Sequence, residues 1–126
     1  IIGMMNTADR SLAMIDYALR RRFVFFDLNP NFKNANFESY RKSLASPAFD
    51  RIISAIESLN AKISIDPAFG PGFQIGYSYF TDLTPDDVDR RLPLIVNYEL
   101  APLFREYYID APDTADRIIE DLRGKL

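Results

Sequence analysis

The residues with the clearest chemical potential lie in one short stretch near the start of the chain, "MNTADRSLAMIDYALRRRF". The stretch opens with polar side chains, among them Asn6 and Asp9, and closes with three consecutive arginines, Arg20, Arg21 and Arg22. An asparagine amide both donates and accepts hydrogen bonds, so it can orient a water molecule or a phosphate oxygen. An arginine is always charged, and its planar fork of donors suits phosphate. These residue types indicate phosphate chemistry.

Each of these side chains also has a purely structural interpretation. Asn6 suits a turn or a helix cap, and Asp9 can cap a helix or pair with its neighbour. The helix dipole favours a cation at a helix C-terminus by about 0.3–1 kcal/mol, which accounts for one arginine. Three in succession point in different directions, so at least one is aimed away from both dipole and core. A solvated cluster and an arginine finger, which reaches a neighbouring active site, both remain open interpretations.

The elements that would position these groups resemble a βαβ unit. Residues 1–5 and 23–28 are short, apolar runs typical of strands buried on both faces. Between them, Leu12, Ile15 and Leu19 recur at helical spacing and predict a crossover helix over residues 11–20. Asn6 would then follow the carboxyl end of the first strand, where open α/β sheets bind ligands. Two parallel strands are not stable alone, so further strands would be needed.

After Asn29 and Pro30 the pattern becomes helical. An apolar stripe predicts a long helix capped by Ser46 with Pro47 at its first position, after a shorter helix. The remaining signals predict, in order, a turn-rich loop over 66–72, a short extended segment over 73–80, a helix start over 84–87, one short helix before Pro93, a longer helix kinked near Pro102, and a last helix from about Pro112 to Arg123 with Gly124 as its stop. We therefore expect a mixed α/β, predominantly α-helical chain: residues 1–29 as a partial βαβ edge and residues 30–126 as a helical domain.

The composition excludes several kinds of chemistry. The chain has 126 residues, 48% of them apolar, and a net charge of −3, which argues against a nonspecific nucleic-acid or membrane surface. Cysteine and histidine are absent, which rules out disulfides, thiolate nucleophiles, His-based triads and the common zinc sites. Asp86, Asp87 and Asp89 predict a capped helix start and no metal site. No membrane-spanning run or signal peptide is seen, so a cytoplasmic location is expected.

The segment quoted first resembles the signature of the McrB family, the nucleotide-hydrolysing AAA+ motor subunits of modification-dependent restriction systems. "QIGYSYF" and "LAPLFREYY" resemble the C-terminal part of the same proteins, so the resemblance covers nearly the whole chain in order. It implies that Asn6 is the sensor-one asparagine, which helps to place the attacking water near the γ-phosphate, and that Asp9 belongs to the same loop. Arg21 and Arg22 match the arginine-finger region, which reaches the nucleotide of the adjacent subunit.

The resemblance also assigns a role to the later part of the chain. Residues 1–29 would be the last part of the AAA+ α/β core, and residues 30–126 the helical lid. Gly76, Tyr77 and Ser78 lie where related motors carry the sensor-two element that contacts the nucleotide. The family usually has histidine at the position of Tyr77, and no arginine lies in this stretch. The nearest substitutes for a sensor-two cation are Arg90 and Arg91.

The implied function is GTP or ATP hydrolysis with Mg²⁺ in an intact ring-forming protein, with a nuclease subunit and DNA as partners through other regions. A phosphate loop of the form G-x-x-x-x-G-K-[ST] is missing from these residues, as is an acidic magnesium-binding strand end. We therefore expect this fragment to be inactive alone and to bind no nucleotide tightly. Two alternatives are a freestanding helical interaction module that binds an acidic partner and a MoxR-like chaperone ATPase. The latter should have an arginine where this chain has Tyr79.

Overall fold

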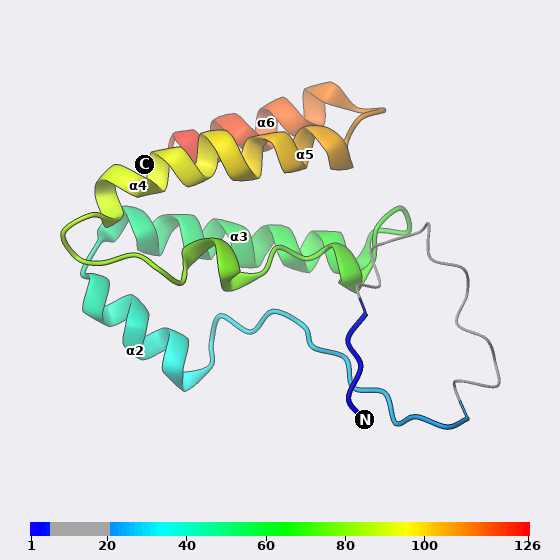
Figure 1. The fold of residues 1–126 in the computed structure, drawn as a ribbon. Helices are drawn as coiled ribbons and strands as arrows, with labels where there is room; N and C mark the ends of the chain where they lie inside the picture. Colours follow the sequence, from blue (N-terminus) through cyan, green and yellow to red (C-terminus); the bar gives the residue numbers. More distant parts are fainter. Residues whose placement is uncertain (6–20) are drawn as a thin grey trace.

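The computed structural model describes residues 1–5 and 21–126, and every regular element within those ranges is helical (Figure 1). The elements are α2 (Ala35–Leu44), α3 (Pro47–Ile65), the 3₁₀ helices η1 (Pro71–Phe73) and η2 (Tyr77–Phe80), α4 (Val88–Leu94), the π-helix η3 (Ile95–Leu100), α5 (Ala101–Tyr107) and α6 (Pro112–Arg123). In Figure 1, α3 runs between α2 on one side and the pair formed by α4–α5 and α6 on the other.

Helix α3 is the central element and forms as its sequence predicts. The Ser46 hydroxyl accepts a hydrogen bond from the Phe49 backbone N–H at 3.2 Å, and Pro47 occupies the first turn, where a missing N–H does no harm. Apolar side chains at helical spacing then face the core. The fully or almost fully buried members of this stripe are Phe49, Ile52, Ile53, Ile56 and Ile63.

The helical backbone from Val88 to Tyr107 is continuous, so the predicted break at Pro93 is wrong, and the kink near Pro102 stays a prediction. Between the two prolines the helix widens into a π-helical stretch, where the Ala101 N–H bonds to the carbonyl of Val96, five residues back. A proline ring clashes with the carbonyl four residues before it, and a π-turn gives that carbonyl room. Pro102, which follows this stretch, is accommodated by local widening of the helix, whereas Pro93 lies inside α4 before the stretch begins.

Helix α6 packs against α5 and η3 and closes the bundle. Ala115, Ile119 and Leu122 are buried, and Ile118 is partly buried against the core, so the predicted last helix is confirmed. The helix ends before Gly124, which has an ordinary right-handed φ of −64°. The helix end therefore does not depend on the left-handed conformation that glycine allows.

The predicted mixed α/β fold is wrong for the described part of the chain. No strand forms within residues 1–5 and 21–126, and the apolar runs proposed as strands have no regular secondary structure and are exposed. Ile1, Met4, Val24 and Phe26 are each more than 80% exposed. A strand is stabilised by backbone bonds to neighbours and by packing on its faces, and the described residues supply neither for these runs.

The prediction of a short extended segment over residues 73–80 is also wrong. The chain there forms two single-turn 3₁₀ helices, η1 and η2, joined by extended residues. The loose alternation of apolar residues arises because Ile75, in the link between η1 and η2, and Phe80, at the end of η2, are both buried in the core, with 1% and 0% of their surfaces exposed.

Candidate functional site

The predicted site residues fall into two groups in the chain. Asn6 and Asp9 lie outside the described residues. Arg21 and Arg22 are the first described residues after position 20 and are exposed in a turn. The second group, Gly76 to Ser78, belongs to the helical unit and can be examined in detail.

The residues Gly76–Phe80, called the Gly76 turn below, form one turn of 3₁₀ helix on the surface of the bundle. Phe80 anchors its end in the core, while Tyr77 and Ser78 are exposed. The Ser78 carbonyl accepts a hydrogen bond from the Thr81 hydroxyl at 3.2 Å. Gly76 has an extended backbone, and an added Cβ would meet the Ser78 hydroxyl at an ordinary 3.7 Å, so neither conformation nor space requires glycine.

Asn60 of α3 holds the chain directly before the Gly76 turn. Its amide nitrogen donates to the Ile75 carbonyl at 2.8 Å, and its amide oxygen accepts from the Ile75 N–H at 2.6 Å. Asn60 is only 5% exposed and Ile75 only 1%, so both bonds are shielded from water. The side chain thus pairs with both backbone groups of one residue, as a neighbouring strand would.

Tyr40 of α2 holds the chain at the other end of the turn. Its hydroxyl donates to the Phe80 carbonyl at 2.7 Å, with the Leu83 carbonyl at 3.1 Å, and accepts from the Leu83 N–H at 2.9 Å. Burial raises the pKa of the Tyr40 hydroxyl, against a lowering by its bond with Leu83. The hydroxyl therefore keeps the proton that it donates across the neutral pH range.

Aromatic rings from other parts of the chain pack against Tyr77 and Phe80 of the turn. The Tyr77 ring lies 6.1 Å from that of Phe32 and 5.9 Å from that of Phe37, measured between centroids. The Phe80 ring meets that of Phe49 of α3 edge to face at 5.9 Å. Such pairs add about 0.5–1.5 kcal/mol each beyond the area that they bury. The turn therefore rests on rings from α2, from α3 and from the chain that enters α2.

The two arginines nearest in sequence to the turn have different surroundings. Arg91 donates to the Asp82 carbonyl at 2.7 Å and to the Asp82 carboxylate at 2.9 Å, and that bond raises its pKa. The Thr84 N–H, which bonds to the Asp87 carboxylate at 2.8 Å, lowers the pKa of Asp87. Arg90 is exposed at the start of α4. Arg91 therefore fastens the loop before α4, which makes it a poor substitute for a sensor-two cation.

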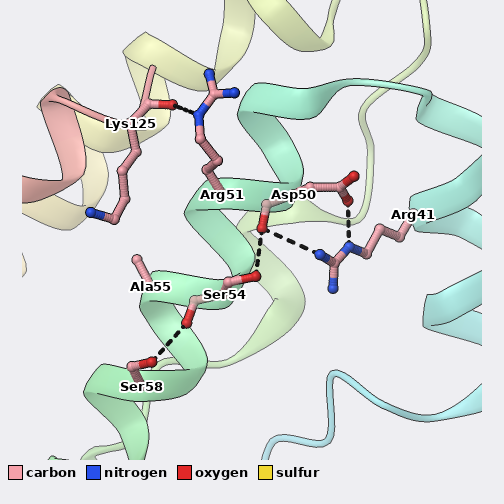
Figure 2. A pocket seen from close by; sticks show the side chains of 7 residues that line it. All are labelled: Arg41, Asp50, Arg51, Ser54, Ala55, Ser58 and Lys125. Carbon is pink, nitrogen blue, oxygen red and sulfur yellow. Dashed lines mark hydrogen bonds and ion pairs between the residues drawn. The ribbon is translucent and has the colours of Figure 1, made fainter.

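A second region with charged side chains is an open groove of about 490 Å³ between α2, α3 and the end of the chain (Figure 2). Arg41 pairs with Asp50, and Arg51 donates to the Lys125 carbonyl at 2.9 Å. The Ser54 hydroxyl donates back to its own helix, to the Asp50 carbonyl at 2.8 Å. The Arg41 and Arg51 bonds join α3 to α2 and to the end of the chain, and the Ser54 bond lies within α3.

Two further negative findings concern only the residues that the structure describes. Among them, no three acidic, histidine or cysteine side chains converge where a metal ion could be held. No helix in the same ranges is both long and apolar enough to cross a bilayer.

Sequence reasoning missed Asn60 and did not see the role of Tyr40. A signal for Asn60 was present, because it continues the spacing of Ile53, Ile56 and Ile63 on the apolar face of α3. A polar side chain in such a stripe must find a partner inside the protein. The identity of that partner, 15 residues away, has no local signal.

Comparisons with known proteins agree with the resemblance in the sequence. Residues 51–116 match the family described as McrB, alpha-helical lid domain, which covers α3, the Gly76 turn and α4 through the start of α6. The chain is 44% identical, over an alignment of 131 residues, to the type IV methyl-directed restriction enzyme EcoKMcrB subunit of Escherichia coli (strain K12). That alignment takes in 98% of this chain but 28% of the relative's length. The chain therefore belongs to the McrB family, and its described helices include the family's helical lid domain.

Proposed function

We propose that this chain is the lid-bearing portion of a nucleoside triphosphatase that hydrolyses GTP or ATP, with Mg²⁺ bound to the nucleotide. The observation that carries the proposal is the match to the McrB lid domain over residues 51–116, together with the 44% identity that extends across the chain. Restriction activity is part of the relative's name. We assign the motor role to this chain because it is similar to that relative.

Within the proposal, residues 30–126 form the lid and residues 1–29 belong to the nucleotide-binding core. Burial supports this boundary. Phe32 is the first described residue to enter the helical core, with 3% of its surface exposed, while residues 21–29 are all exposed. Pro30 and the hydrogen-bonded turn between Asn31 and Asn34 separate the two parts.

The proposed chemistry is phosphoryl transfer to water. Asn6 and Asp9 belong to the loop that orients the water, whose oxygen attacks the γ-phosphorus as the bond from that phosphorus to the β–γ bridging oxygen breaks. Arg21 and Arg22 stabilise the charge that develops on the nucleotide of the adjacent subunit. The exposure of both arginines is compatible with such a reach across a ring interface.

Gly76, Tyr77 and Ser78 are proposed to contact the nucleotide from the lid. Two features support this assignment. Tyr77 and Ser78 are exposed although both ends of the turn are fixed in the core, and the turn lies inside the matched lid region. Ring neighbours, a nuclease subunit and DNA are the proposed partners of the full-length protein, the last two through regions outside these residues.

The arginine assignment is tested by Arg21→Ala and Arg22→Ala in the full-length protein. Removing an arginine finger lowers turnover by about 10³-fold or more. The arginine's positive charge stabilises the transition state much more than the bound substrate. Nucleotide affinity, measured by equilibrium titration, should change less than threefold or so on the same reasoning. Arg105→Ala, which removes an exposed arginine from α5, is the matched control.

A mixing experiment separates action in the neighbouring subunit from action within one subunit. If the arginines act across the interface, adding Arg21→Ala subunits to wild-type rings should inactivate sites in the wild-type subunits. If both single variants hydrolyse nucleotide at the normal rate, the arginine-finger assignment is wrong.

A further inference from the structure

Two side chains from different helices hold the Gly76 turn by hydrogen bonds, one at each end. Asn60 of α3 pairs with both backbone groups of Ile75, immediately before the turn. Tyr40 of α2 bonds to the carbonyl of Phe80, the last residue of the turn, and to Leu83 beyond it. The exposed residues Tyr77 and Ser78 lie between these two fixed points.

These hydrogen bonds fix the register of the turn because each side chain uses both a donor and an acceptor. A shift of the turn by one residue would place a carbonyl opposite an acceptor or an N–H opposite a donor, and would leave buried groups unpaired. Each unpaired group would cost about 1–3 kcal/mol. Apolar packing by Phe80 alone would not impose this register, since packing is not directional.

We propose that Asn60 and Tyr40 are positioning residues for nucleotide binding. They hold the Gly76 turn in the position and register in which it contacts the nucleotide. This inference rests on the proposed contact between the turn and the nucleotide. Neither side chain touches the nucleotide itself, since Asn60 is buried and the Tyr40 hydroxyl is committed to the backbone of the loop.

The test uses Tyr40→Phe and Asn60→Asp in the full-length protein. The first removes one hydroxyl and keeps the ring. The second keeps the shape but replaces the amide donor by an oxygen that repels the Ile75 carbonyl. Tyr108→Phe and Asn97→Asp are matched controls: Tyr108 is half-buried with its ring against that of Phe69, and Asn97 donates to the Pro93 carbonyl at 2.8 Å and accepts from Arg123 at 2.8 Å.

The first measurement is hydrogen exchange of peptides over residues 74–84 without nucleotide, read by mass spectrometry. Both test variants should accelerate exchange there by about three- to tenfold, the effect of losing one hydrogen bond of ordinary net strength. The controls should leave this peptide unchanged. Unchanged exchange in the test variants would overturn the inference, because the side chains would then not hold the turn.

The second measurement is steady-state hydrolysis of GTP and of ATP. The test variants should raise KM by about three- to tenfold with a smaller change in kcat, since a loosened turn binds ground state and transition state equally less well. Ser78→Ala, which alters the turn's own surface, tests the proposed contact separately. If Ser78→Ala raises KM and the two test variants do not, the positioning role is wrong and the contact survives. If none of the three raises KM, the contact itself is wrong, and the inference falls with it.

Discussion

Replacing Asn60 by leucine should destabilise the helical domain by about 2.5 kcal/mol. The substitution keeps the branching of the side chain but removes both hydrogen bonds to Ile75, at 2.8 and 2.6 Å. The Ile75 N–H and carbonyl would stay buried without partners, because Ile75 is only 1% exposed. Two such groups cost about 1–3 kcal/mol each, and the gain from burying a leucine in place of an amide offsets about 1–2 kcal/mol of that sum.

The measurement is urea unfolding of the 126-residue chain, followed by helical circular dichroism. The midpoint should fall while the slope with denaturant stays constant, since the surface exposed on unfolding is nearly unchanged. Asn36→Leu, on the exposed side of α2, is the control and should change the free energy of unfolding by about 0.5 kcal/mol or less.

An Asn60→Leu variant as stable as the wild type would refute the reasoning. It would mean that the loop before the Gly76 turn can move until water reaches both backbone groups of Ile75. The two bonds would then fix nothing, and the arguments that depend on them would fail as well.

Three further substitutions test other parts of the fold by the same unfolding measurement. Phe49→Ala should cost about 3–5 kcal/mol, because its fully buried ring lies among aromatic neighbours from two elements. Ser46→Ala should cost about 1–2 kcal/mol, since it removes the cap of α3 and a bond to Asp89. The pKa of Asp87 is lowered in the folded state, so its contribution is complete above the unfolded-state value of 3.8 and is lost as the pH falls through the folded value. Asp87→Asn, which keeps an acceptor for the Thr84 N–H, should therefore flatten the loss of stability in acid.

The helices could be predicted because their signals are local. Ser46 with Pro47 marks the start of α3, and Pro112 marks the start of α6, within one residue of the observed positions. The π-helix between Pro93 and Pro102 could not be predicted in the same way. Two prolines argue for a break, but the helix continues between them and η3 packs against α6.

The α/β prediction failed for a different reason. Residues 1–5 and 23–28 have the composition of buried strands, but composition describes the surroundings that a segment suits and does not supply them. A parallel strand becomes a strand only when neighbours accept and donate along its length. The described residues contain no such neighbour, and these runs are irregular and exposed.

Three polar side chains join the same two parts of the helical domain. Ser46 and Asn60 are the buried polar side chains of the described residues, and Tyr40 is half-buried. Each bonds to the chain between Ile75 and Asp89. A buried polar pair adds little net stability over an apolar one, but it penalises every alternative arrangement. The helices α2 and α3 therefore form the core and also determine where the exposed Gly76 turn lies, which supports the proposed contact between that turn and a nucleotide.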